Sequence, residues 1–319
     1  MLNDQSFRSV VARACLAPSV HNIQPTRWHR SDDGIDVFCD LTQSLPVGDP
    51  HHLDAGLSSG AAIEATVLAL SEMGVSAQVE ERWDAHSDLK PVAHIRLQSG
   101  LQDGLSRQLE NRFTWRGKFA DQTPDLFGWS RSDTFVITDA KRRNWLAELN
   151  DQTSYRIMQN PAFRKELLSW MRLRDTHPRL GLDGMGREAC QMSDLQARMA
   201  GLALGPLWGM LNLFGATKSI TSEAEATKSA PVIAAFHQPT EASPIARGRA
   251  YLRMWLEATS LGFSGWPMAA LSDDPSANAE ICARLGIGAD RDLVQVIRFG
   301  VAMGPPPARA RRPLDELII

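Results

Sequence analysis

The sequence predicts an α+β protein, in which helices and strands are mixed without strict alternation. Two long apolar segments, at about 53–73 and 245–261, have the length of helices, and each is followed by a glycine. A strand–turn–strand pattern covers residues 28–40, where Ser-Asp-Asp-Gly separates two extended runs. The other strand-like segments do not alternate one by one with helices, as a parallel βαβ sheet would require.

The first hundred residues predict two helices and four strands. Phe7, Val10 and Val11 repeat at helical spacing, and Pro18 follows the end of this first helix. In the long second helix, the small residues 60–62 would let another backbone approach closely. The expected segments in this part are a helix at 5–17, two strands within 28–40, a helix at 53–73 and strands at 76–83 and 92–98.

The rest of the chain predicts a longer mixture of elements. Residues 195–213 are unusually apolar, and we expect one helix there, buried between the two parts of the chain. Residues 174–196 look irregular, and 262–274 is expected to be a loop. The other expected segments are helices at 104–112, 141–158, 161–173, 245–261 and 276–285, and strands at 133–139, 230–237 and 293–302.

The composition is that of an ordinary folded protein. Of 319 residues, 43% are hydrophobic and 22% are charged, which excludes a disordered or fibrous chain. The net charge is −3, so no overall positive field favours nucleic acid or an anionic membrane. No continuous apolar run approaches the roughly 20 residues that span a bilayer, and the N-terminus lacks the pattern of a signal peptide. We therefore expect a cytoplasmic protein that binds neither nucleic acid nor membrane.

The sequence carries no motif for hydrolysis or metal binding. It lacks the signatures of serine hydrolases, zinc proteases and P-loop proteins. His51 and His52 are better explained as a solvated helix start than as metal ligands. The four cysteines lie far apart, which predicts neither a zinc site nor a disulfide framework: Cys15, Cys39, Cys190 and Cys282. We therefore expect no metal and no protein nucleophile.

Three stretches carry side chains suited to ligand binding. Residues 18–25 read Pro-Ser-Val-His-Asn-Ile-Gln-Pro, and their hydroxyl and amide groups can serve a heteroaromatic ring edge. In an extended backbone, Arg112, Thr114 and Arg116 would share one face, which suits a phosphate. Residues 309–313 read Arg-Ala-Arg-Arg-Pro. Taken singly, the three stretches also fit a capping loop, an exposed strand and a solvated basic tail.

Together the three stretches resemble the nitroreductase family of FMN-dependent oxidoreductases. In that family a Pro-Ser-Ser-x-Asn-x-Gln-Pro loop touches the flavin, while an Arg-x-Ser-x-Lys/Arg segment and a terminal Lys/Arg-x-Arg-x-Pro hold its phosphate side. A loop after a long helix lies against the flavin ring. The resemblance therefore implies an FMN site made by Pro18, Ser19, Val20, Asn22, Gln24, Arg112, Thr114, Arg116, Trp266, Pro267, Met268, Arg309 and Arg311.

The order of these stretches differs from that of ordinary family members, in which the Arg-x-Ser segment comes first. The family site forms across a homodimer interface, so a tandem fusion of two halves accounts for the order found here. The resemblance then implies a nitroreductase-like fold in two halves around central helices. Residues 1–100 would supply the partner-side loop, and residues 101–319 the phosphate side, with a candidate lid at 174–228. The chain would be a monomeric pseudo-dimer or form a homodimer.

The resemblance implies an oxidoreductase that takes hydride from NAD(P)H and passes electrons through FMN to a nitroaromatic, a quinone or a similar small acceptor. The flavin performs the redox chemistry, which agrees with the lack of a protein nucleophile. A second interpretation is a non-enzymatic protein that binds or sequesters FMN under a lid. Val20 and residues 269–270, which are two alanines, replace a serine and a Glu-Gly found in many relatives. A third interpretation is a scaffold that binds a protein partner and no flavin.

Overall fold

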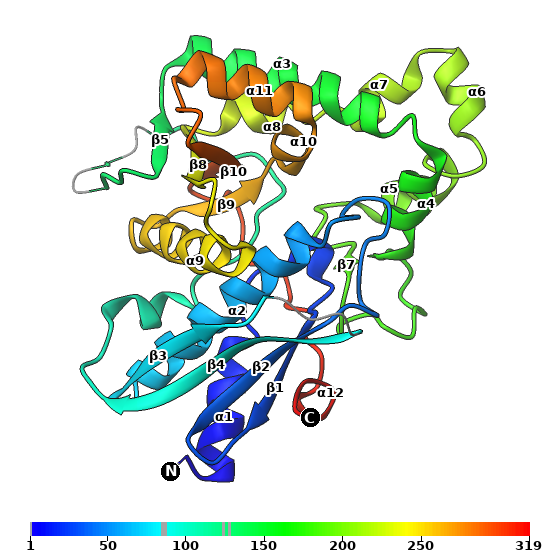
Figure 1. The fold of residues 1–319 in the computed structure, drawn as a ribbon. Coiled ribbons are helices and arrows are strands. Elements are labelled where there is room, and N and C mark those ends of the chain that lie inside the picture. Colours follow the sequence, from blue (N-terminus) through cyan, green and yellow to red (C-terminus); the bar gives the residue numbers. More distant parts are fainter. Residues whose placement is uncertain (1, 84–87, 123–124, 127–128) are drawn as a thin grey trace.

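The computed structural model describes residues 2–83, 88–122, 125–126 and 129–319, and it contains two four-stranded sheets with two long helices between them (Figure 1). Both four-stranded sheets are antiparallel throughout. Helices and strands are thus mixed without βαβ units in these sheets, and the predicted α+β fold class is confirmed.

The first sheet has the order β1-β2-β4-β3 and is built from residues 26–99. Trp28, Ile35 and Ile95 of this sheet pack with apolar residues of α1 and α2 in one core. The predicted hairpin, long helix and two further strands are all present. Their bounds are α1 Asp4–Ala14, β1 Thr26–Arg30, β2 Gly34–Asp40, α2 Leu53–Ser71, β3 Val75–Glu81 and β4 Leu89–Ser99.

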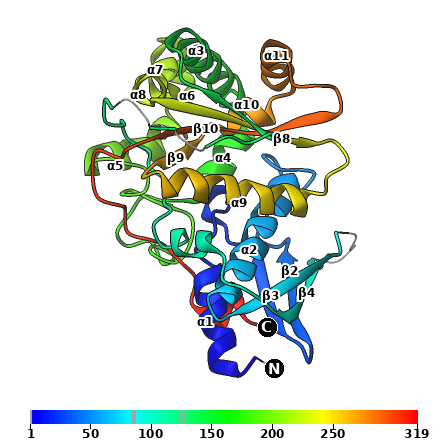
Figure 2. The same cartoon turned by 90° about the vertical axis from the view of Figure 1, so that its left-hand side faces the viewer.

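The second sheet has the order β5-β8-β10-β9 and is covered on both faces (Figure 2). Helix α9 packs on one face through Met254 and Trp255, whereas α3, α10 and α11 pack on the other. The bounds are β5 Thr134–Ile137, α3 Ala140–Ile157, β8 Val232–Pro239, α9 Pro244–Ser260, β9 Ser264–Pro267, α10 Ala269–Asp273, α11 Pro275–Leu285 and β10 Arg291–Gly300.

Helices α2 and α9 touch at two glycines. A Cβ on Gly60 would lie 2.2 Å from the Ile245 carbonyl oxygen, and one on Gly248 would lie 2.1 Å from the Leu57 carbonyl oxygen. The close approach that the small residues of the long helix predict is therefore confirmed. Beside this contact, Glu64 of α2 is 3% exposed and pairs with two arginines of α9.

Helix α2 passes a length and composition test for a membrane span, with a mean hydropathy of 1.3. Of the tested window, 78% is buried inside the protein. Packing between the first sheet and α9 therefore accounts for the apolar character of this helix.

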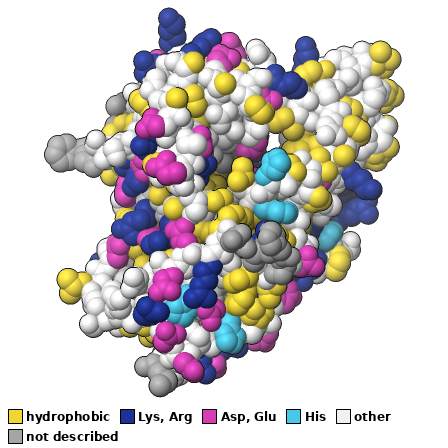
Figure 3. Space-filling model, in the orientation of Figure 1, with side chains coloured by type: hydrophobic (Ala, Val, Ile, Leu, Met, Phe, Trp, Pro, Cys, Tyr) yellow, Lys and Arg dark blue, Asp and Glu magenta, His cyan; other side chains and the backbone are white. Residues whose placement is uncertain are grey.

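The apolar segment 195–213 differs from the prediction. It forms two helices, α5 Asp194–Ala203 and α6 Trp208–Leu213, and Gly205-Pro206 separates them because proline cannot continue a helix. The segment is also not buried between the sheets. Figure 3 shows apolar side chains gathered over α5 and α6, and Leu213 and the following Phe214 are exposed.

Shorter elements complete the chain. The loop expected at 262–274 instead contains β9 and α10, because four residues pair with the edge of β10. The helix expected at 104–112 is a 3₁₀ helix, η2 Gly104–Gln108, and a second 3₁₀ helix, η1, covers Val20–Asn22. The remaining elements are α4 Pro161–Ser169, β6 Met171–Arg172, β7 Met185–Gly186, α7 Ala216–Thr221, α8 Ala224–Ser229 and α12 Leu314–Leu317.

The C-terminal tail leaves the second sheet and returns to the first. Ile318 forms a β-bridge with Trp28, and α12 lies against α1 and β1, so both termini are at the same end of the molecule (Figure 1). The tail thereby passes the loop that follows α1. The assignment of 1–100 and 101–319 as two nitroreductase-like halves stays a prediction.

Candidate functional site

A cavity of about 310 Å³ lies where four distant segments meet. The loop after α1, the stretch around 112–116, residues 172–189 and the tail at 307–311 form its lining. It brings together eight of the residues that the sequence singled out: Pro18, Ser19, Asn22, Arg112, Thr114, Arg116, Arg309 and Arg311.

The loop after α1 has an unusual backbone. His21, Asn22 and Gln24 all adopt positive φ angles, of 43°, 57° and 53°, which non-glycine residues rarely do. Polar contacts hold this conformation. Asn22 donates from Nδ2 to the carbonyl oxygens of Gly184 and Ala310, both at 3.1 Å, and its Oδ1 accepts from Arg311. The Asn22 side chain therefore fixes two other walls of the cavity.

The stretch at 112–116 lies beside β9, with a backbone bond of 3.0 Å from Trp115 N–H to Gly265 O. Arg112 is 4% exposed, and its guanidinium lies 4.8 Å from the Trp255 ring centroid. Its Nη2 donates to the Leu16 carbonyl oxygen at 2.9 Å. Its Nε and Nη1 are buried and have no partner in the described structure. Two buried donors are thus left for a ligand.

Four arginines of the cavity form no ion pair with any carboxylate of the described residues: Arg112, Arg116, Arg309 and Arg311. Backbone carbonyls accept from them instead: Arg116 donates to Ala189 at 3.1 Å, and Arg309 to Arg112 at 3.1 Å. The Nε of Arg311, like two nitrogens of Arg112, is buried and has no hydrogen-bond partner among the described residues.

Burial and mutual repulsion disfavour the charged forms of these guanidinium groups. Burial, together with the charges of Arg311 and Arg309, lowers the pKa of Arg112 to about 9. Burial and the charge of Arg309 lower the pKa of Arg311 to about 10. A bound dianion would compensate these charges and occupy the orphaned donors. The arrangement is therefore chemically suited to a phosphate group.

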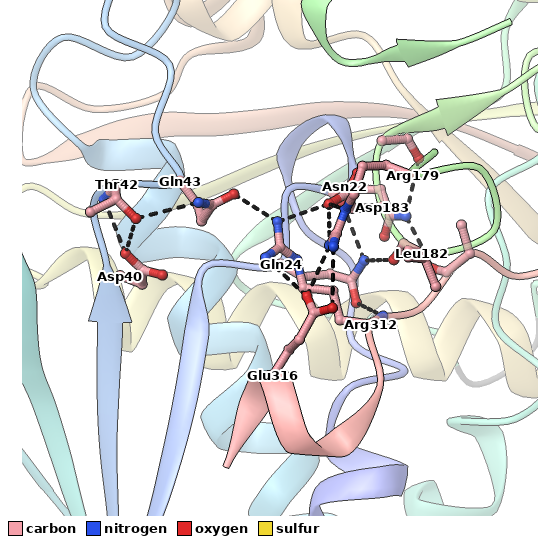
Figure 4. Close-up of polar contacts among 12 residues, drawn as sticks. Asn22, Gln24, Asp40, Thr42, Gln43, Arg179, Leu182, Asp183, Arg312 and Glu316 are labelled. Carbon is pink, nitrogen blue, oxygen red and sulfur yellow. Dashed lines mark hydrogen bonds and ion pairs between the residues drawn. The ribbon is translucent and has the colours of Figure 1, made fainter. Parts of the chain in front are cut away.

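Residues 172–189 form one wall of the cavity; most of them belong to the candidate lid at 174–228, but none of them was predicted as a site residue. Their main chain accepts hydrogen bonds from the predicted stretches. Leu182 O accepts from Gln24 Nε2 at 2.9 Å (Figure 4). Gly181 O accepts from Arg311 N–H at 3.0 Å. Every residue type has a carbonyl, so no sequence pattern could have marked these acceptors.

Five predicted site residues do not line the cavity. Val20 donates its backbone N–H to Ser58 Oγ, and Gln24 is buried, where its Oε1 accepts from the Arg312 N–H. Trp266 stacks 3.8 Å from the Arg298 guanidinium, Pro267 pairs with Ile297 in the second sheet, and Met268 is buried in the core under α10. The contacts of these residues with a flavin stay a prediction.

No cluster of His, Cys, Asp or Glu in the described part of the chain could hold a metal ion, and the four cysteines are free. His21, beside the cavity, is held neutral because burial and the charge of Arg116 lower its pKa to about 4. The polar side chains that line the cavity are those of arginine, serine, threonine and asparagine, together with two carboxylates, Asp175 and Glu188.

The sequence was compared with known proteins. No family model matches the chain. The chain is similar along its length to the Mycobacterium tuberculosis protein named "Putative NAD(P)H nitroreductase acg", with 24% identity over 333 aligned positions that cover 99% of this chain and 96% of the relative. The predicted resemblance to the nitroreductases is confirmed. A second M. tuberculosis protein, "Putative NAD(P)H nitroreductase Rv3131", is 35% identical over 99 residues, which are 31% of this chain and 28% of that one.

Solved structures of nitroreductases have a lower sequence identity to this chain than the full-length relative has. The FMN- and NADPH-dependent nitroreductase NfnB from Sphingopyxis sp. strain HMH matches at 20% identity, with 68% of this chain and 98% of that one covered and a TM-score of 0.36. NfnB from Mycobacterium smegmatis in complex with NADPH matches at 21% identity, with coverage of 62% and 86% and a TM-score of 0.35. At these TM-scores, the relation to nitroreductases rests on the full-length sequence match.

Proposed function

We propose that the chain binds one FMN in the cavity and is a flavin-dependent oxidoreductase. The observation that carries the proposal is Arg112, a buried arginine without an ion pair in the described structure, whose Nε and Nη1 lack partners and which lines the cavity. A site with so much uncompensated positive charge favours a ligand with a concentrated negative charge, as a phosphate monoester has.

The residues present fit FMN. Arg112, Arg309 and Arg311 would hold the phosphate, because they line the cavity and pair with no carboxylate of the described residues. Ser19 and Thr114 line the same cavity and offer hydroxyls to the ribityl chain or the ring. Because the chain carries one copy of each stretch, we infer one FMN per chain.

When bound, the flavin supplies the transfer of hydride and electrons, and the protein supplies binding and orientation. We propose NAD(P)H as the reductant and a nitroaromatic, a quinone or a similar small molecule as the acceptor. This proposal follows the name of the full-length relative, "Putative NAD(P)H nitroreductase acg".

A second candidate function is the binding of FMN without turnover. The specific observation that favours it is the wall at 172–189, which is bonded through its backbone to the loop after α1, to Arg116 and to the tail. A wall held at three places would restrict access of a reductant to the cavity. The two alanines at 269–270, where many relatives have Glu-Gly, agree with this alternative.

The test is an absorbance spectrum of the purified protein, before and after FMN is added, followed by anaerobic addition of NADPH. Visible bands of an oxidised flavin that stay with the protein on gel filtration support FMN binding, and their bleaching by NADPH supports the oxidoreductase. Bound flavin that neither NADPH nor NADH bleaches, but dithionite does, supports the second candidate. A colourless protein that takes up no FMN would refute both.

A further inference from the structure

Asp183 binds three arginines and is 2% exposed. Figure 4 shows it with two of them, Arg179 and Arg312. Its Oδ1 accepts from Nε and Nη2 of Arg172 at 3.0 and 2.8 Å. Its Oδ2 accepts from Nε of Arg179 and from Nη2 of Arg312, both at 2.9 Å. One buried carboxylate thus joins guanidinium groups from the start of the wall, from within the wall and from the C-terminal tail.

These contacts connect Asp183 to the cavity without placing it in the lining. Gly184, the next residue, lines the cavity and accepts from Asn22 Nδ2 at 3.1 Å. Arg312 directly follows Arg311, and its backbone N–H donates to Gln24 Oε1 at 3.0 Å. A displacement of Asp183 would therefore move the wall and the tail that carry the ligand-facing groups.

The arginines around the cavity fall into two sets. Arg172, Arg179 and Arg312 all have Asp183 as a partner, and Arg187 pairs with Asp194, whereas the cavity-lining Arg112 and Arg311 pair with no carboxylate of the described residues. Burial by itself would raise the pKa of Asp183, but hydrogen bonds from Arg179 and Arg172 hold it below its usual range. The Asp183 carboxylate is therefore ionised at neutral pH and compensates the first set only.

We propose that Asp183 is a positioning residue for phosphate recognition. It fixes the wall and the tail so that Arg311 faces the phosphate of a bound flavin. This inference rests on the proposed FMN binding. Its consequence is selective: loss of Asp183 should weaken contacts to the phosphate more than contacts to the flavin ring.

The test compares the affinities of the full-length chain for FMN and for riboflavin, which lacks the phosphate, by fluorescence titration. Asp183→Asn keeps the size of the side chain but removes its charge and one acceptor oxygen. We expect FMN affinity to fall about tenfold or more, the effect of one lost charge-assisted contact, with little change for riboflavin. A general loss of structure would lower both affinities together.

The matched control is Asp133→Asn. Asp133 also binds an arginine with both oxygens, each at 2.7 Å from Arg131, and its side chain is 14% exposed, but it does not line the cavity. We expect this variant to keep the wild-type preference for FMN over riboflavin. If Asp183→Asn does not fold, Arg312→Gln breaks one of the three links and should shift the preference in the same direction by a smaller factor.

The outcomes separate the two proposals. In one outcome, the wild-type protein prefers FMN and the folded Asp183→Asn and Arg312→Gln variants show the same preference. That result overturns the role of Asp183 and leaves the proposed function intact. Wild-type protein that binds neither FMN nor riboflavin overturns both.

Discussion

The contact between α2 and α9 and the cavity are both places where distant segments meet, but different forces hold them. At the helix contact, Gly60 and Gly248 bring backbones together, and apolar side chains surround them. At the cavity, four segments meet through backbone carbonyls, amides and arginines, with buried donors left unpartnered.

This difference predicts which substitutions should change the stability of the fold and which should change ligand affinity. The helix contact leaves no space for added atoms, so its residues should determine the free energy of unfolding. The cavity keeps uncompensated charge that costs stability, so its residues should determine ligand affinity. The predictions below separate these two effects.

Gly248→Leu should have the largest effect. The new Cβ would lie 2.1 Å from the Leu57 carbonyl oxygen, so the two long helices must separate. We expect a loss of about 3 kcal/mol or more in the free energy of unfolding, measured by urea denaturation. The control is Gly201→Leu in the exposed part of α5, where no described atom outside the helix's own backbone lies within 4 Å of the new Cβ. Equal stability of both variants would show that the helix contact is adaptable.

Glu64→Gln should have the next largest effect on stability. Glu64 accepts from Arg249 at 2.9 Å and from Arg253 at 2.7 Å. Removal of its charge leaves Arg249 without a carboxylate partner among the described residues and leaves Arg253 with Asp103 alone. We expect a cost of about 3 kcal/mol in denaturant titrations, as for a broken buried ion pair. Glu80→Gln, which breaks an exposed pair with Arg96, should cost less than about 1 kcal/mol. A Glu64 variant as stable as the Glu80 variant would contradict this prediction.

Arg112→Met should separate binding from stability. Methionine fills a similar space and removes a buried charge that has no carboxylate partner in the described structure. We expect an unchanged or higher melting temperature, together with a loss of about 1.5–3 kcal/mol in FMN binding measured by titration calorimetry. Arg284→Met, on the exposed face of α11, is the control and should change neither quantity. Unchanged FMN affinity in the Arg112 variant would remove the basis of the proposed site.

The pH dependence of FMN affinity should be the smallest effect. Arg112 has a lowered pKa of about 9, so its charge is present below that pH and is lost above it. A bound phosphate favours the protonated form, so affinity should fall as the pH rises through about 9. Riboflavin shares the ring chemistry but lacks the phosphate, so its affinity should fall less. Parallel curves for both ligands, from fluorescence titrations, would contradict the role of Arg112.

Much of the fold was predictable because it follows from local patterns. Periodic apolar residues gave the long helices, and a turn sequence gave the first hairpin. The prediction of one helix at 195–213 was wrong because Gly205-Pro206 interrupts this segment, although apolar residues continue on both sides of it. Strand β9 was missed because a four-residue edge strand depends on its pairing with β10 and has little signal of its own.

By itself, the sequence determined which side chains can bind a phosphate and a flavin ring. The charge that suits a phosphate belongs to side chains such as that of Arg112, and the amide that suits a ring edge belongs to side chains such as that of Asn22. Only the tertiary structure decided that residues 172–189 complete the cavity and that Asp183 joins three arginines. The physical reason is that the wall binds through backbone carbonyls, which every sequence has. An aspartate likewise becomes a buried partner for arginines only when the chain brings them together.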